Sequence, residues 1–228
     1  ENITAAARAL AREKEMSVFM LFRAALALVF YKYSSQDDMI IGTVDAGRDH
    51  ADLENQLGFF INSIPLRTKV EGTQTVTGFL ERIKADTLDC FRHKQYPYDL
   101  LVQDMGMPAG HGINPLFDVV LSVQNLDPVK HPGAAGIEIT RFERETRKAP
   151  FGLIFTVCEL DTEFYIEVYY KKDLYRKDTA VMLQNGLRTM LERMAAMRGA
   201  TVDQLVSDES QAIGKKDFLD NLFNLAFE

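Results

Sequence analysis

The spacing of apolar and polar residues predicts a chain that contains both helices and strands. Residues 18–33 are apolar on nearly all sides of a helix axis, which is typical of a helix buried in a core. Over residues 76–91, apolar side chains recur every three or four positions and charged side chains fill the other face, as in an amphipathic helix. We expect further helices over residues 5–16 and 98–105, and a closing helix that begins at Asp178 as its cap.

Shorter runs with β-branched, aromatic and alternating residues predict five strands. Turn-forming residues bound these runs, which are residues 39–44, 116–123, 137–142, 151–157 and 164–170. An acidic turn separates the last two, so we expect them to form an antiparallel hairpin. The pattern as a whole predicts the α/β (α+β) class.

Residues 57–67 (LGFFINSIPLR) form a dense apolar run in the middle of this pattern. A run of this length predicts the approach to a fully covered strand. Asn62 interrupts it, and an unpaired buried amide costs about 1 to 3 kcal/mol. The amide therefore either holds neighbouring backbone or faces a solvated channel. Pro65 cannot donate to a sheet ladder, which favours a position at a sheet edge or seam.

The same run resembles the GxFVNT…R motif of the condensation domains of non-ribosomal peptide synthetases. The matching positions are Gly58, Phe60, Ile61, Asn62, Ser63 and Arg67. Ile61 and Ser63 are conservative departures from the motif.

Three further segments resemble motifs of this family, in the same order. Residues 41–48 (IGTVDAGR) are similar to GTPVAGR, although Asp45 stands where a small apolar residue is usual. Residues 93–99 (HKQYPYD) resemble HQxxPFE and include His93 and Pro97. Asn114 and Pro115 open a segment similar to the end of RDxSRNPLF, whose Arg-Asp start is missing here. The strand over residues 119–125 also ends in the expected Gln-Asn. The resemblance covers essentially the whole chain.

The HHxxxDG motif of the family is absent. Its second histidine orients or deprotonates the attacking amine in the family, and it belongs to the amino-terminal half of the domain. None of the four histidines here is adjacent to another, and none is followed by xxxAsp-Gly. The resemblance therefore implies a carboxyl-terminal half, and we expect no catalytic residue in this chain.

The resemblance also implies a fold and a division of the chain. The expected fold is a chloramphenicol-acetyltransferase-like two-layer sandwich that forms one half of a two-lobed domain. Residues 1–198 would be this subdomain, and residues 199–228 would begin a linker toward an adenylation domain. The start of the chain has the character of a cut inside a longer polypeptide. Half of a two-lobed enzyme also retains exposed apolar surface and can self-associate.

In this family, amide bonds form between acyl and aminoacyl groups that are tethered as thioesters to carrier proteins. The implied partners are the amino-terminal half, peptidyl and aminoacyl carrier proteins and an adjacent adenylation domain. The chain would supply one tunnel wall and a carrier-docking face, with no cofactor of its own. The phosphopantetheine arm of each carrier would be the substrate tether. Condensation and cyclisation remain alternative subtypes.

Three charged or titratable residues have alternative roles. Arg48 and Arg67 can orient carbonyl groups or meet the phosphate of a carrier arm, since a guanidinium is a rigid donor fork. Each can equally form an ordinary salt link. His93 can serve as a general base, because imidazole exchanges protons near neutral pH. It can instead sit at a helix end and bind backbone, and we favour this second role.

Composition narrows the function classes. The 228 residues are 46% hydrophobic and 26% charged, as in ordinary globular proteins. A net charge of -7 argues against nucleic-acid binding, which needs a basic face. The longest apolar run is interrupted by Arg23 and is too short to span a membrane, and no export signal is visible. Two distant cysteines predict reduced thiols in the cytoplasm and no metal site.

Two other functions stay open. One is a non-catalytic module that binds carrier proteins. The other is a stand-alone acyltransferase that uses His93. Whether the chain alone is an enzyme is therefore uncertain at this stage.

Overall fold

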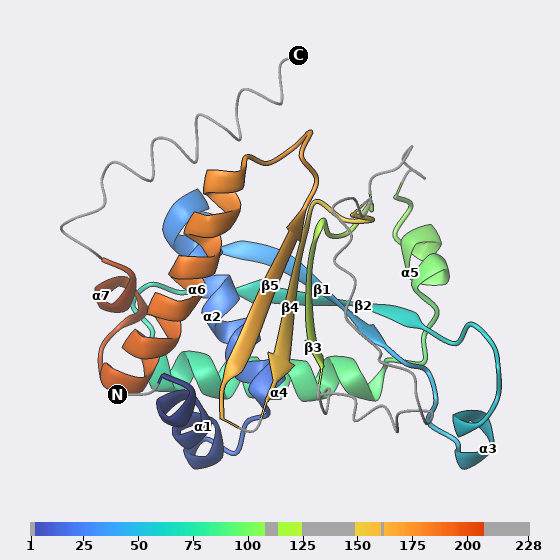
Figure 1. Cartoon of the computed structure of the whole chain (residues 1–228), viewed down its shortest axis with the longest axis horizontal. Helices are drawn as coiled ribbons and strands as arrows, with labels where there is room; N and C mark the ends of the chain where they lie inside the picture. The colour runs from blue at the N-terminus through green and yellow to red at the C-terminus, as the bar shows by residue number, and fades with distance from the viewer. Residues whose placement is uncertain (1–2, 108–113, 125–148, 161, 208–228) are drawn as a thin grey trace, which may run out of the picture.

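A five-stranded mixed sheet forms one layer of the protein, and helices pack against it (Figure 1). The structure, a computed structural model, describes residues 3–107, 114–124, 149–160 and 162–207. The strands lie in the order β2-β1-β3-β4-β5. The central neighbours β1, β3 and β4 are parallel, whereas both edge strands, β2 and β5, pair antiparallel. This two-layer arrangement agrees with the predicted α/β sandwich.

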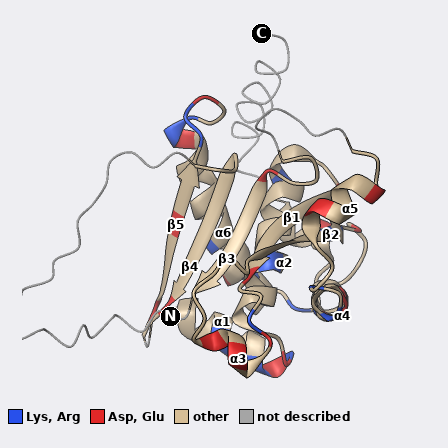
Figure 2. Cartoon of the chain, turned by 90° about the vertical axis from the view of Figure 1, so that its right-hand side faces the viewer, with Lys and Arg blue, Asp and Glu red and all other residues tan. Residues whose placement is uncertain are grey.

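The elements follow the predicted pattern closely. The strands are β1 (Asp38–Asp45), β2 (Asn62–Lys69), β3 (Val119–Gln124), β4 (Leu153–Glu159) and β5 (Phe164–Tyr170). The helices are α1 (Ile3–Glu13), α2 (Val18–Ser34), α3 (Ala51–Glu54), α4 (Val76–Arg92), α5 (Tyr98–Asp104), α6 (Lys177–Ala196) and α7 (Val202–Val206). Strands β4 and β5 form the expected antiparallel hairpin. Charged residues lie mainly on helices and loops, and β3 carries none (Figure 2).

Helix α2 lies at the centre of the core. Its sequence, VFMLFRAALALVFYKYS, leaves almost no polar face, and residues 20–29 are all buried. Ser17 begins the helix by accepting a hydrogen bond from the backbone N–H of Met20 (3.2 Å). The helix then packs against α1, α4, α6, β1 and β3. The predicted central helix is therefore confirmed.

Arg23 lies inside this apolar helix and is completely buried. Its guanidinium donates to the Thr87 hydroxyl of α4 (2.5 Å), and on β2 to the Thr68 hydroxyl (3.0 Å) and the Arg67 carbonyl oxygen (2.9 Å). Its Nε has no hydrogen-bond partner. Burial lowers the pKa of this guanidinium below its ordinary value. Arg23 thus joins α2, α4 and β2 through one buried side chain.

The apolar run over residues 57–61 differs from the prediction. We expected it to approach a covered strand, but β2 begins only at Asn62, and Leu57, Phe59 and Ile61 are exposed. Apolar character alone cannot distinguish a buried strand from an exposed apolar loop. The Pro65 prediction is confirmed, because β2 is an edge strand.

The start of α6 also differs from the prediction. Helix α6 is capped by Arg176, so Asp178 lies in its first turn. An acidic side chain there still favours the helix, since it faces the positive end of the helix dipole.

The packed body extends beyond residue 198, where we placed the domain boundary. In α7 the side chains of Val202 and Leu205 are fully buried, and Thr201 and Gln204 form a capping box. The backbone of residues 200–203 also bonds to residues 72–76. The packing therefore continues at least to Val206. The remaining linker residues and the predicted strand over 137–142 lie outside the described residues.

Within the described residues, no single helix has the length and apolar character needed to cross a membrane. Helices α1 and α2 meet that criterion only as a pair, by length and composition alone, and they are bent by 108° at their junction.

Candidate functional site

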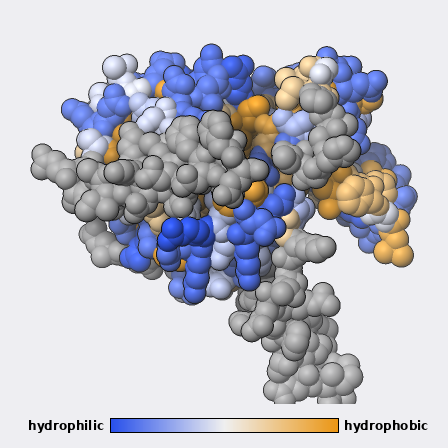
Figure 3. Space-filling model, turned by 90° about the horizontal axis from the view of Figure 1, so that it is seen from above, coloured by the Kyte–Doolittle hydropathy of each residue, from blue (hydrophilic) through white to orange (hydrophobic). Residues whose placement is uncertain are grey.

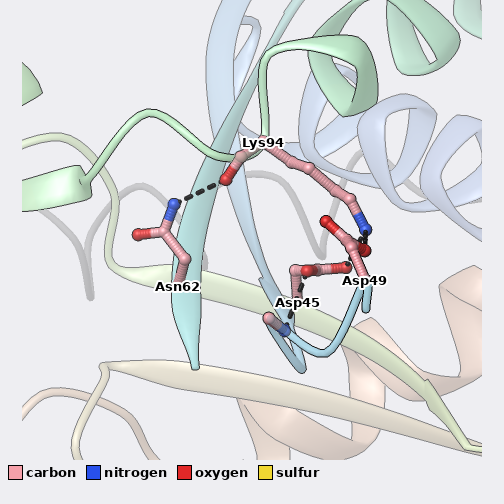
Figure 4. A network of polar contacts seen from close by, with 5 residues as sticks. Asp45, Asp49, Asn62 and Lys94 are labelled. Carbon is pink, nitrogen blue, oxygen red and sulfur yellow. Dashed lines mark hydrogen bonds and ion pairs between the residues drawn. The ribbon is translucent and has the colours of Figure 1, made fainter. Parts of the chain in front are cut away.

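The side chain of Asn62 joins the start of β2 to the loop between α4 and α5 (Figure 4). Its amide nitrogen donates to the carbonyl oxygens of Lys94 (2.7 Å) and Tyr96 (2.9 Å), and its amide oxygen accepts from the backbone N–H of Tyr98 (3.1 Å). Of the two roles predicted for this amide, the structure therefore shows the first, in which it holds neighbouring backbone. Two segments with motif resemblance, 57–67 and 93–99, are thereby fastened together.

Lys94 extends this network to the end of β1. Its ammonium donates to Asp49 (2.5 Å) and Asp45 (3.2 Å), as Figure 4 shows. The hydrogen bond with Asp49 raises the pKa of Lys94, and the same bond lowers the pKa of Asp49. The sequence drew attention to Asp45 only as a departure from a motif. Lys94 and Asp49 were missed, although Lys94 also replaces the glutamine of HQxxPFE.

Asn114 fastens the fourth motif segment to α5. Its side-chain oxygen accepts from the Tyr98 hydroxyl and from the backbone N–H groups of Leu116 (3.2 Å) and Phe117 (3.3 Å). The Phe117 ring lies against Gly42 of β1, where a Cβ atom would come within 2.0 Å of it. Phe117, the aromatic residue of the NPLF segment, therefore needs a glycine at position 42, in the segment that resembles GTPVAGR. Pro115 follows Asn114 and is half-buried.

Arg48 holds the loop that precedes β2. Its guanidinium donates to the carbonyl oxygens of Leu53, Gln56 (2.9 Å) and Gly58 (3.5 Å) and lies over the Phe60 ring, 4.6 Å from its centre. These contacts with the protein's own loop favour a structural role over contact with a carrier arm, which stays a prediction.

Arg67 and His93 take the simpler of the roles that we considered. Arg67 forms a two-point salt link with Asp38, at 2.9 Å and 2.6 Å. The link raises the pKa of Arg67 and lowers that of Asp38. His93 is the carboxyl-terminal cap of α4, and its Nδ1 lies 3.0 Å from the Asp89 carbonyl oxygen. His93 therefore serves the helix end, as we favoured.

The network encloses one side of an open pocket of about 540 Å³. Its wall includes acidic residues, Lys94 and Asn62, an apolar group from residues 59–61, and Pro97, the residue that begins α5. Gly58 lies in the exposed loop beside it, where a Cβ would come 2.7 Å from the Phe60 ring.

The described residues near this pocket contain no imidazole poised as a base. His50, in the pocket wall, bonds the Asp52 backbone N–H through Nδ1 (3.3 Å). Burial raises the pKa of the Cys90 thiol, which opposes a reactive thiolate. Among the described residues no group of acidic, histidine or cysteine side chains is arranged to hold a metal ion. His111 and His131 lie outside the described residues. The arrangement can shape and position a ligand.

Known proteins match most of this chain in sequence. The chain is 31% identical over 211 residues to tyrocidine synthase 3 of Brevibacillus parabrevis, spanning 92% of this chain and 3% of that protein. It is 32% identical over 205 residues to surfactin synthase subunit 1 of Bacillus subtilis (strain 168), spanning 89% of this chain and 6% of that protein. The chain thus spans a small part of these curated relatives.

Solved structures share the fold. A four-domain nonribosomal peptide synthetase superposes with a TM-score of 0.81 at 20% identity, over 92% of this chain and 17% of that one. The X-domain from teicoplanin biosynthesis gives a TM-score of 0.76 at 22% identity, over 88% of this chain and 46% of that one. The predicted chloramphenicol-acetyltransferase-like fold is therefore confirmed. Residues 1–213 match the condensation domain family over most of the chain, so this chain belongs to the condensation domains of nonribosomal peptide synthetases.

Proposed function

We propose that the chain is the carboxyl-terminal subdomain of a condensation domain, in which it forms one wall of the reaction tunnel and a carrier-docking face. The network around Asn62 carries this proposal. One side chain fastens the start of β2 to the α4–α5 loop, and Lys94 ties that loop to the end of β1. Segments that resemble three family motifs thus become one connected wall beside a pocket, and Asn114 of the fourth bonds Tyr98 of α5.

The division of labour follows from what this wall contains. The polar side chains of Asp45, Asp49, Asn62 and Lys94 are engaged with one another and with backbone, and His93 does not line the pocket, so the wall is suited to positioning. The base would come from the HHxxxDG motif of an amino-terminal half. The span of this chain, 46% of the teicoplanin X-domain and 46% of the condensation domain from a monacolin K synthase, supports a half-domain.

The reaction would join two carrier-tethered substrates. The amine of the acceptor attacks the donor thioester carbonyl, an amide forms, and the donor carrier leaves as a free thiol. A wall that holds both phosphopantetheine arms in place raises the effective concentration of the amine near the thioester. The partners would be the amino-terminal half, the two carrier proteins and an adenylation domain beyond the linker.

The test uses the purified chain with two loaded carrier proteins, and amide formation is read by mass spectrometry of the acceptor carrier. The chain alone should form no amide. Adding a separately produced amino-terminal half with HHxxxDG should restore formation, and replacing the second histidine of that motif by alanine should abolish it. Turnover by the chain alone would overturn the half-domain assignment. Tight carrier binding without turnover, even after the half is added, would favour a non-catalytic binding module.

A further inference from the structure

We propose that Asp45, Asp49 and Lys94 form an ion-pair lock that positions the loop of residues 46–61 against the α4–α5 loop and so fixes the shape of the pocket beside Asn62. Lys94 is held at both ends. Its carbonyl oxygen accepts from Asn62 (2.7 Å), while its ammonium bonds both carboxylates. Through its side chain, Lys94 connects the α4–α5 loop to Asp45 at the end of β1 and to Asp49 in the loop that follows. The neighbouring Gln95 side chain also bonds Asp49.

The lock reaches the apolar part of the pocket through Gly47. The second oxygen of Asp45 accepts from the Gly47 backbone N–H (2.9 Å). Gly47 has φ +65 and passes so close to the Phe60 carbonyl oxygen that a Cβ would lie 1.9 Å from it. A displacement of Asp45 therefore moves Gly47, and Gly47 sets the position of the Phe60 backbone.

The Lys94–Asp45 pair is partly shielded from water, which weakens its screening by solvent and salt, whereas the Lys94–Asp49 pair is exposed. The side chains of Asp45 and Lys94 are 17% and 24% exposed, and that of Asp49 is 41% exposed. Pairs that are fully exposed contribute little, because solvent and salt screen them. Arg48 bonds this loop to itself, but Leu57 and Phe59 are exposed and make no core contacts, so the lock is one of the attachments of the loop to the rest of the protein. Locally, the lock should therefore help to decide the position of the loop.

The sequence gives independent support. Asp45 stands where the GTPVAGR motif has a small apolar residue, and Lys94 stands where HQxxPFE has glutamine. The two departures meet at 3.2 Å, although they are 49 positions apart. A lysine at this position without acidic partners would be partly desolvated, and no ion pair would offset that cost. The two departures from the motifs therefore place opposite charges at one contact.

The test measures backbone hydrogen exchange of the whole chain by mass spectrometry. In Lys94→Met, amides of residues 46–61 should exchange about three- to tenfold faster than in the wild type, while β3 and β4 should be unchanged. Lys84→Met is the matched control. Lys84 also bonds a carboxylate, Glu15 (3.1 Å), and is 28% exposed, but it lies in α4 away from the pocket. It should leave residues 46–61 unaffected.

Two further variants separate a specific lock from general loss of structure. Lys94→Arg should restore slow exchange, because a guanidinium can bond both carboxylates. Asp45→Asn removes the charge that pairs with Lys94 but keeps an acceptor for the Gly47 N–H. As a single change it should speed exchange of residues 46–61. Added to Lys94→Met it should have little further effect, because the ion pair is already lost. Unchanged exchange in residues 46–61, or a uniform increase across the sheet, would overturn the lock.

The link to the reaction rests on the proposed function and is measured separately. In the two-half domain, Lys94→Met should lower the rate of amide formation at saturating carriers severalfold, with carrier binding unchanged, and Lys94→Arg should recover it. Loop opening without a loss of rate would overturn this link. Failure of the wild-type domain to form any amide would instead overturn the proposed function, and the exchange result would stand.

Discussion

Replacement of Asn62 by aspartate tests whether the amide holds the wall together. The two side chains have the same shape, so the change alters hydrogen bonding without creating a cavity. The amide nitrogen, which donates to two carbonyl oxygens at 2.7 Å and 2.9 Å, becomes an oxygen that cannot donate when ionised. Three oxygens would then converge on one point. The bond from the Tyr98 N–H can persist.

The expected cost follows from these contacts. Two lost hydrogen bonds contribute about 1 kcal/mol each, and repulsion between the carboxylate and the two carbonyl oxygens adds to this, so we expect about 2 to 4 kcal/mol. Asn62→Ala loses all three bonds, but water can reach the freed carbonyl groups, because Lys94 is half-buried and Tyr96 is exposed. It should cost about 1 to 2 kcal/mol. The order of stability at pH 7 is therefore wild type, alanine variant, aspartate variant.

The aspartate variant should also depend on pH in a defined direction. Facing two carbonyl oxygens disfavours the ionised form, so the pKa of this new carboxyl should be raised in the folded state above its unfolded value of about 3.9. Between these two values the folded state holds the extra proton, and the free energy of unfolding rises as the pH falls. The deficit relative to the wild type is complete above the folded pKa and shrinks on acidification. The protonated group can again donate one hydrogen bond.

Urea unfolding measures both effects. The chain contains no tryptophan, so far-UV circular dichroism is the suitable signal. Midpoints and slopes at pH 7 and pH 5 give the free energies of the three proteins. An aspartate variant that is as stable as the wild type at pH 7, or more stable than Asn62→Ala, would refute the assigned role. So would a deficit that is the same at both pH values.

Three other predictions follow from the same contacts. Arg23→Ala should lower the free energy of unfolding by about 3 kcal/mol or more, because buried acceptors lose their donor and a cavity forms; a urea midpoint like that of the wild type would contradict this. The pKa values of Asp38 and Asp49 are lowered in the folded state, so their ion pairs stabilise the protein above the unfolded pKa. This contribution is lost as the pH falls through the folded pKa values. Replacing both residues by Asn should therefore flatten the dependence of the urea midpoint on pH below about 4. His93→Ala should leave amide formation by the two-half domain unchanged, and a loss of more than tenfold with normal folding would restore the general-base hypothesis.

The elements with strong periodicity were predictable from the sequence. Helices α2 and α4 and the β4–β5 hairpin appear within a few residues of their predicted ends. In each of these elements, apolar residues recur with the helical or the strand period over several turns or pleats. The local sequence therefore determines whether the segment is a helix or a strand. The motif resemblance then led to the correct family.

The polar network could not be predicted in the same way. Asn62 and Lys94 are 32 positions apart, and Lys94 and Asp45 are 49 apart, so no local pattern connects them. Arg23 illustrates the same limit. In the sequence it only interrupted an apolar run, whereas the fold buries it because acceptors on β2 and α4 converge on it. Long-range pairing of this kind depends on the topology of the sheet.

The exposed loop connects these observations to the proposed division of the domain. Phe59 is 86% exposed, and its neighbours Leu57 and Ile61 are exposed as well. Figure 3 shows apolar surface at the right-hand end of the molecule. Covering a side chain of this size contributes about 1.5 to 3 kcal/mol, so a loop that keeps three of them in water forgoes considerable stability. Arg48 and the Asp45–Lys94 pair nevertheless bond this loop to itself and to the α4–α5 loop. A fixed apolar surface beside the pocket is what a wall needs if another lobe closes over it, and this is the situation that the half-domain proposal describes.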